Sequence, residues 1–111
     1  MAKPAPYLGE LELVVLLALH RLPGPAYGMA VYDELVQTTG RDLTAPTVYI
    51  TLSRLEKKGY VQSRIGEPAP HRGGRAKRFF EVTLEGERAM RRSREMLERL
   101  WGERVPQRPV S

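Results

Sequence analysis

The sequence contains no cysteine. Disulfides, cysteine-ligated zinc, iron–sulfur clusters and thiol chemistry are therefore excluded, and this composition suits a reducing compartment. Long hydrophobic runs are also scarce, since the longest, Leu13 to Leu19, is far shorter than the roughly 20 residues that span a bilayer. That run follows Glu10 and Glu12 and lacks a cleavage site of small residues, so it does not resemble a signal peptide. We therefore expect a soluble, cytoplasmic protein with no membrane partner.

Motifs for catalysis and metal binding are missing as well. His20 and His71 are far apart in the sequence and have no metal-ligand spacing. Ser53 lies outside any GxSxG context, and the RGGR of residues 72–75 lacks the GK[ST] ending of a phosphate-binding loop. We expect no enzyme, no catalytic residue, no metal site and no cofactor.

The residues that are present describe a small basic domain. The chain has 111 residues, of which 41% are hydrophobic, so it is long and apolar enough to bury one core. It carries 18 Lys and Arg against 13 Asp and Glu, a net charge of +5. Such a balance favours a phosphate-bearing, anionic-lipid or acidic-protein partner, and nucleic acid first among these.

Hydrophobic periodicity and turn residues predict the order helix, helix, helix, strand, loop, strand, helix. The expected helices cover residues 9–21, 26–38, 45–58 and 84–104, and the expected strands lie within residues 60–66 and 76–84. This order predicts an α+β, mostly α fold: a winged helix-turn-helix of three helices plus a β-hairpin wing, with a C-terminal dimerisation helix. We expect a DNA-binding domain over 1–83, the dimerisation helix over 84–104 and a flexible tail over 105–111.

The third expected helix has two unlike faces. Val48, Leu52 and Leu55 recur at helical spacing and form one buried stripe. Ile50 then points away from that stripe, within an outward arc that also holds Thr47, Ser53, Arg54 and Lys57. Arg, Ser and Thr can bond base edges and an apolar side chain can pack on a thymine methyl, so this arc predicts base reading. An ordinary surface helix is the alternative, because single exposed apolar residues are common.

The expected wing is rich in arginine. Basic side chains at its edges could bind phosphates or enter a narrow minor groove, although a solvated hairpin would have the same composition. Tyr49 and Lys58 flank the third helix, and Tyr27 with Gly28 begins the second helix, where contact with DNA and simple packing are both open. The candidate DNA-binding residues are Tyr27, Thr47, Tyr49, Ile50, Ser53, Arg54, Lys57, Lys58, Arg72, Arg75, Lys77 and Arg78.

The first and last helices carry more apolar surface than one small domain needs. A second subunit could cover it, and a two-fold dimer suits palindromic DNA. Docking of the last helix on its own domain is the alternative. A further hypothesis places an apolar effector pocket at the centre of the dimer. The candidate interface and pocket residues are Leu13, Leu16, Leu17, Met90, Met96, Leu97, Leu100 and Trp101.

These segments resemble the PadR-like transcriptional regulators. The resemblance rests on GELELVVLLAL, AYGMAVYDEL, TVYITLSRLEKKGYV and GGRAKRFFEVTLEG, which follow one another in the family's order between Gly9 and Gly86. It implies a homodimeric winged-helix regulator, commonly a repressor, that a small molecule releases from DNA in some members. The single short final helix is similar to that of the smaller subgroup. Where the family usually has Pro after TVY, this sequence has Ile50, so base preference is not carried over.

The sequence thus predicts a dimeric, sequence-specific DNA-binding transcriptional regulator, a repressor that a small apolar effector could release. A winged-helix protein-interaction adaptor is the alternative from another class, because the apolar first and last helices could bind a protein. A non-specific nucleic-acid binder is a third reading, against which the outward Ile50 counts, since binding phosphates requires no apolar side chain there.

Overall fold

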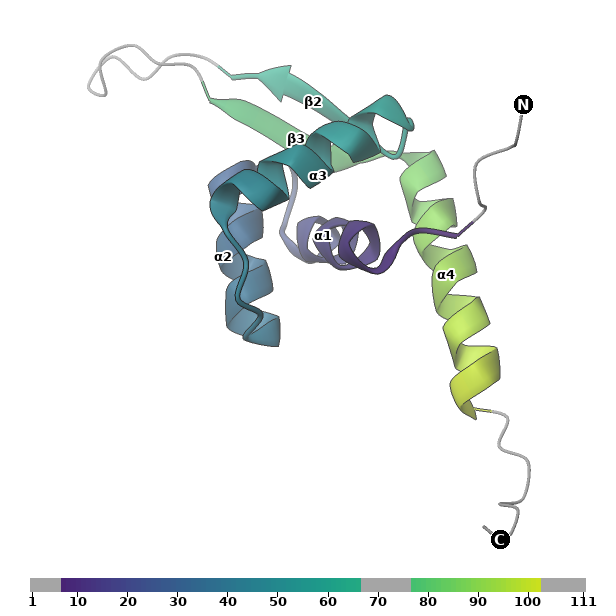
Figure 1. Cartoon of the computed structure of the whole chain (residues 1–111). Coiled ribbons are helices and arrows are strands. Elements are labelled where there is room, and N and C mark those ends of the chain that lie inside the picture. Colours follow the sequence, from purple (N-terminus) through teal and green to yellow (C-terminus); the bar gives the residue numbers. More distant parts are fainter. Residues whose placement is uncertain (1–6, 67–76, 103–111) are drawn as a thin grey trace, which may run out of the picture.

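The computed structural model describes residues 7–66 and 77–102 (Figure 1). Within them the chain forms four helices and a three-stranded antiparallel sheet, which confirms the expected mostly helical α+β fold. The elements are α1 (Glu10–Arg21), β1 (Ala26–Tyr27), α2 (Gly28–Thr39), α3 (Ala45–Lys57), β2 (Val61–Ile65), β3 (Arg78–Val82) and α4 (Leu84–Gly102). The predicted wing residues Arg72 and Arg75 lie outside the described residues.

The sheet contains one strand that the sequence did not predict. Its order is β1-β3-β2, so β3 is the central strand. Ala26 pairs with Phe80 and Tyr27 with Phe79, whereas the second helix was expected to start at Ala26. That expectation was wrong because an isolated pair of residues has no strand periodicity of its own. Ala26 and Tyr27 become extended by pairing with a strand far along the chain, and α2 begins only at Gly28.

The termini of α2 and α3 follow the turn chemistry of the sequence. Gly40 ends α2 in the left-handed conformation, at φ 67°, and Gly59 follows α3 at φ 83°, where a side chain would be strained. Thr44 caps α3 by accepting a hydrogen bond of 3.3 Å from the backbone N–H of Thr47. These confirmed caps fix both ends of α3 to within one residue of the prediction.

The core lies around α1. In Figure 1, α1 occupies the centre of the domain, with α3 above it, α2 on one side and α4 on the other. The buried apolar side chains are Val15, Leu16, Ala18, Leu19, Ala26, Val31, Leu35, Val48, Leu52, Leu55, Val61, Phe80, Ala89 and Met90. Leu16 is 0% exposed, so assigning it to a subunit interface was wrong. Because α1 has helices on three sides, the face that carries Val15, Leu16 and Leu19 is buried within its own subunit.

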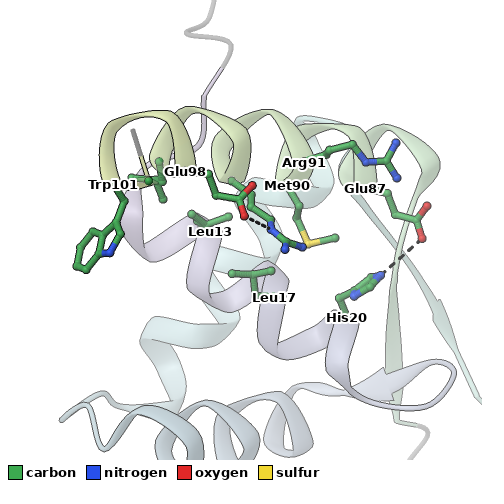
Figure 2. A pocket seen from close by; sticks show the side chains of 11 residues that line it. Leu13, Leu17, His20, Glu87, Met90, Arg91, Glu98 and Trp101 are labelled. Atoms are coloured by element: carbon green, nitrogen blue, oxygen red, sulfur yellow. Dashed lines mark hydrogen bonds and ion pairs between the residues drawn. The ribbon is translucent and has the colours of Figure 1, made fainter. Parts of the chain in front are cut away.

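The last helix is divided between the core and the surface. Its first half packs on the domain through Gly86, Ala89, Met90 and Ser93, which are all buried. Its second half projects away, and Leu100 and Trp101 are 77% and 84% exposed. Figure 2 shows Leu13 and Leu17 of α1 facing α4, with Trp101 pointing outward near its end. The alternative of docking within the subunit therefore holds for the first half of α4 only.

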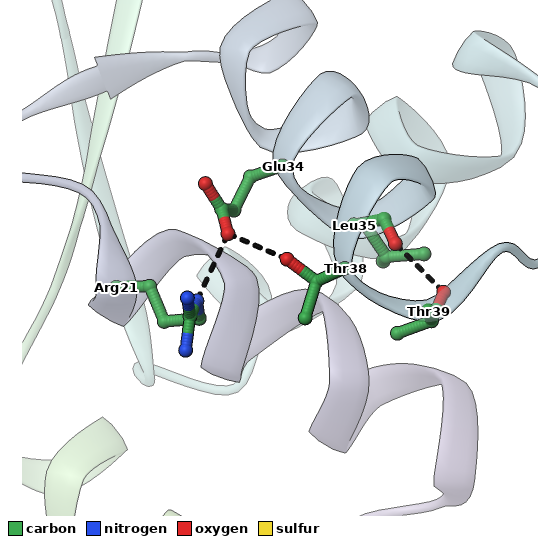
Figure 3. A network of polar contacts seen from close by, with 5 residues as sticks. All are labelled: Arg21, Glu34, Leu35, Thr38 and Thr39. Carbon is green, nitrogen blue, oxygen red and sulfur yellow. Dashed lines mark hydrogen bonds and ion pairs between the residues drawn. The ribbon is translucent and has the colours of Figure 1, made fainter.

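A polar network fixes the end of α1 against α2 (Figure 3). Arg21 donates a 2.9 Å hydrogen bond from Nε to Glu34, and the Thr38 hydroxyl donates to the same carboxylate oxygen at 2.7 Å. These two hydrogen bonds hold the pKa of Glu34 below its ordinary value. The network links the last residue of α1 to the second half of α2.

None of the helices in the described ranges is long and apolar enough to cross a membrane.

Candidate nucleic-acid interface

The outward face of α3 has the arrangement that its periodicity predicted. Val48, Leu52 and Leu55 are fully buried against the domain. Ile50 is 57% exposed on the opposite side. The side chains that accompany it on this exposed face are Ser53, Arg54 and Lys57. One apolar, one hydroxyl and two basic side chains on one face are the chemical groups that can read base edges and hold phosphates in a major groove.

Thr47 takes part in the start of the helix as well as facing outward. It is half-buried, and its hydroxyl shares a 2.9 Å hydrogen bond with the hydroxyl of Thr44. Thr51, one turn further along, is buried and donates from its hydroxyl to the Thr47 carbonyl at 2.8 Å. Since a hydroxyl can donate one hydrogen bond and accept two, the hydroxyl of Thr47 can bond a base while it keeps this contact with Thr44.

Tyr49 lies against the first residue of α2. A side chain added to Gly28 would place its Cβ only 2.3 Å from Cε1 of the Tyr49 ring, closer than atoms can approach. The ring therefore covers the Gly28 backbone, while Tyr49 stays 39% exposed. This contact supports the packing interpretation of Gly28 and leaves an exposed part of Tyr49 at the surface, where α2 and α3 meet.

Lys58 is held by an acidic partner from α1. Its Nζ donates to Glu12 Oε2 at 2.6 Å. Partial burial alone would raise the pKa of the Glu12 carboxyl. Hydrogen bonds from Lys58 and from the Gly9 N–H, together with the positive charges of Lys58 and Arg54, nevertheless hold that pKa below its ordinary value. Sequence reasoning missed Glu12, since nothing in the spacing of residues 12 and 58 shows that they meet.

Arg78 is likewise bound at the base of the wing. Its Nη1 donates to the Ser63 hydroxyl at 3.1 Å and lies 3.8 Å from the Glu56 carboxylate of α3. The Ser63 hydroxyl also donates to Glu56 at 2.5 Å. These contacts join β2 and β3 to α3. Arg78 was expected to contact DNA directly, and in this arrangement its described contacts are with Ser63 of β2 and Glu56 of α3.

Lys77 and Tyr27 come together on the outer face of the sheet. The Lys77 ammonium lies 4.3 Å from the centre of the Tyr27 ring, and that ring meets Phe79 edge to face at 5.2 Å between centroids. Both contacts are of a kind that stabilises packing. Lys77 remains exposed, so its charge is still presented to the surroundings of the wing.

A groove of about 830 Å³ lies between α1 and α4 (Figure 2). Of the predicted interface residues, it brings together Leu13, Leu17, Met90, Leu97 and Trp101. Two polar pairs border it: His20 lies 3.7 Å from Glu87, and Arg94 forms an ion pair with Glu98 at 3.3 Å. The predicted residues Leu16, Met96 and Leu100 are not among its lining residues. The sequence analysis did not assign His20, Arg91 and Arg94 to this groove, because it considered only the apolar positions of the two helices.

In the described part of the chain, no three His, Cys, Asp or Glu side chains are grouped closely enough to hold a metal ion.

Comparison with known proteins places this arrangement in a family. No relative was found among curated protein sequences. Among solved structures, a PadR family regulator from Eggerthella lenta is 27% identical, with a TM-score of 0.66 over 84% of this chain and 80% of that one. A PadR-like transcription factor from Bacteroides fragilis matches at 21% identity and a TM-score of 0.70, over 83% of this chain and 84% of that one.

A transcriptional regulator from Clostridium thermocellum matches over the same shares of the two chains, at 23% identity and a TM-score of 0.68. The similarity to the Bacteroides fragilis and Clostridium thermocellum structures shows the winged-helix fold. A sequence profile described as the transcriptional regulator PadR-like family matches residues 15–92, most of the chain. That match runs from the core of α1 through α3 and the sheet into α4. The chain belongs to the PadR-like family of transcriptional regulators, a family of DNA-binding proteins that are generally not enzymes.

Proposed function

We propose that this regulator is a homodimer that binds a palindromic operator sequence-specifically, represses transcription, and is released by a small apolar effector. The proposal places it in the cytoplasm, with a DNA-binding unit over residues 1–83 and a dimerisation helix over 84–104. The single observation that carries sequence-specific DNA binding is the exposure of Ile50. This side chain is 57% exposed on α3, directly opposite the buried stripe.

The face around Ile50 favours reading of bases over simple attraction to phosphates. Binding to phosphates requires only positive charge, and Arg54 and Lys57 supply it on the same face. A branched apolar side chain at the centre of that face has a use in a major groove, where it can contact a thymine methyl. We assign base contacts to Thr47, Ile50, Ser53 and Arg54, and backbone contacts to Tyr49, Lys57, Lys77 and the wing.

Lys58 and Arg78 have a conditional place in this interface. Each is now paired with a carboxylate, Lys58 with Glu12 and Arg78 with Glu56. A phosphate would compete with those carboxylates for the same cation. We therefore expect Lys58 and Arg78 to contribute less to DNA affinity than Lys57 does.

The exposed half of α4 supports dimerisation. Leu97, Leu100 and Trp101 form an apolar end that the domain itself does not cover, and Leu17 of α1 is 42% exposed beside the same groove. A second copy that packs there would bury these side chains and present two copies of α3 to one face of DNA. An apolar effector would occupy the part of the groove that the second copy leaves open. If the second copy filled the groove completely, no effector could bind there.

Binding of the purified protein to DNA from upstream of its own gene, compared with scrambled DNA of equal length, tests this function. We expect a preference of about 10³-fold or more for the upstream DNA, with one dimer bound. Equal affinity that falls steeply with salt would mean a phosphate binder. An interaction adaptor would bind neither DNA, and its Arg54→Ala variant would retain its protein partner.

A further inference from the structure

The hydroxyl of Thr83 contacts the ends of two helices at once. Thr83 lies between β3 and α4, and its Oγ1 accepts a 3.0 Å hydrogen bond from the Gly86 N–H, which caps α4. The same hydroxyl donates its proton to the Gly59 carbonyl at 2.7 Å. Because Gly59 directly follows α3, one side chain links the end of the outward-facing helix to the start of the last one.

The segment that leaves α3 is itself tightly closed. The Tyr60 N–H donates to the Leu55 carbonyl at 2.9 Å and the Gly59 N–H to the Glu56 carbonyl at 3.0 Å, the two bonds of a Schellman motif. The Tyr60 carbonyl then accepts a 3.1 Å hydrogen bond from the backbone N–H of Thr83. Thr83 therefore binds the carbonyls of Gly59 and Tyr60, the two residues that close the motif.

Gly86 brings the two segments into backbone contact. A Cβ on this buried residue would lie 2.1 Å from the Tyr60 carbonyl oxygen and 2.8 Å from Cγ1 of Val82. The first turn of α4 consequently rests directly on the chain leaving α3, with no side chain between them that could yield. Contact between two backbones transmits a shift with less relaxation than contact through flexible side chains.

A second attachment of α4 lies away from α3. The buried Ser93 hydroxyl accepts a hydrogen bond of 3.1 Å from the Leu8 N–H, which precedes α1. This bond also holds α4 on the domain, but it does not involve α3 or the Gly59–Tyr60 segment. It therefore provides a matched control for the contact made by Thr83.

We propose that Thr83 is a positioning residue for DNA recognition: its two hydrogen bonds and the Gly86 contact make the direction of α4 fix the direction of α3. This inference rests on the proposed function, in which two copies pair through α4 and bind a palindrome. In such a dimer these contacts between α3 and α4 set the separation of the two α3 helices. That separation in turn sets the spacing of half-sites that the protein accepts.

The distance between spin labels on α3 and α4 tests this coupling of the two helices without DNA. Since the sequence has no cysteine, Ser53→Cys on α3 and Arg99→Cys on α4 can be labelled selectively, and dilution with unlabelled protein restricts the measurement to one chain. The variants are Thr83→Ser, which keeps the hydroxyl; Thr83→Val, which removes it; and Thr83→Asp, which can cap α4 but cannot donate to Gly59.

We expect the distance distribution to stay narrow in Thr83→Ser and to broaden in Thr83→Val and Thr83→Asp. Ser93→Ala should lower the melting temperature and leave the distribution narrow. Unchanged distributions in the valine and aspartate variants would overturn the proposal. Equal broadening in Ser93→Ala would overturn it as well, because α4 would then be held by packing as a whole.

Operators with altered spacing test the consequence for recognition. We expect the wild-type dimer to prefer one spacing by about tenfold over operators with one base pair added or removed, a typical coupling. In Thr83→Asp the preference should fall to within about threefold, with dimerisation unchanged. A retained preference would contradict the proposal. If the wild type bound no operator, the proposed function would fail, and the spin-label distances would still decide whether Thr83 joins the helices.

Discussion

The ring of Tyr49 lies directly on the backbone of Gly28. A Cβ at residue 28 would meet three ring atoms, Cε1, Cζ and the hydroxyl oxygen, at 2.3, 2.5 and 2.9 Å. This contact joins the first residue of α2 to the middle of α3, so the angle between the two helices of the helix-turn-helix depends on the absence of one side chain.

Gly28→Ala should therefore destabilise the protein by about 1–3 kcal/mol, the range for an overpacked site. Urea denaturation would measure the loss. Gly102→Ala is a suitable control, because a Cβ there has no atom within 4 Å, and it should be nearly neutral. In a Tyr49→Ala background Gly28→Ala should cost less, since the two effects are coupled through one contact. Equal costs in both backgrounds would show that the ring is not the obstacle.

Substitutions on the exposed face of α3 should separate base reading from attraction to phosphates. Arg54→Ala is expected to cost about 1–3 kcal/mol on the cognate operator and to relax the preference at its base pair. Lys57→Ala should weaken binding to all sequences alike and reduce the slope of affinity against salt by about 1. Titrations of both variants on operator and scrambled DNA provide the measurement. If Arg54→Ala lost the same affinity for operator and for scrambled DNA, Arg54 would contact the DNA backbone and not a base.

The ion pair between Glu12 and Lys58 predicts a pH dependence of stability. The folded-state pKa of Glu12 is below 4.5, the ordinary value of a glutamate. Its contribution to stability is therefore fully present above pH 4.5 and is lost as the pH falls through the folded-state pKa. The stability advantage of the wild type over Glu12→Gln should shrink in denaturation curves recorded from pH 6 down to pH 3. Lys58→Met should remove most of this dependence. Parallel curves for wild type and Glu12→Gln would count against the pair.

Trp101→Ala should weaken dimerisation without destabilising the folded subunit. The side chain is 84% exposed, so the subunit loses little packing when it is truncated. A buried tryptophan at an interface typically contributes 2 kcal/mol or more, which corresponds to about 30-fold in the dissociation constant. Analytical ultracentrifugation would measure this change, with Arg99→Ala as the control from the same helix.

Trp101 also provides its own probe, because it is the one tryptophan in the sequence. Its emission should shift to shorter wavelength as the protein concentration rises and the side chain leaves water. A spectrum that is independent of concentration in a sample shown to be dimeric would place the interface elsewhere.

The sequence predicted what depends on local chemistry. Thr44, Gly40 and Gly59 act on their own neighbours, so the ends of α2 and α3 follow from residue type. The buried stripe and the outward Ile50 follow equally from helical periodicity. The winged-helix fold was predictable because its elements are marked one after another along the chain.

Features that depend on contacts between distant residues were missed. The strand β1 exists only because β3 pairs with it. The partners of Lys58 and Arg78 come from other elements, so both residues resembled free basic side chains in the sequence. Leu16 matched its neighbours on α1 in composition, and only the position of α1 between three helices shows that it is buried.

The central place of β3 also determines when the domain can be completed during synthesis. β1 and β2 are both made before β3, and within this sheet each pairs only with β3. Until Val82 has left the ribosome, the extended backbones of Tyr27 and Val61 have no strand partner, although the first three helices are already available to collapse around α1. Exposed strand edges of this kind are aggregation-prone. Between the emergence of α3 and that of β3, the nascent chain therefore carries strand segments without a partner, and this is the interval in which the residues between β2 and β3 leave the ribosome.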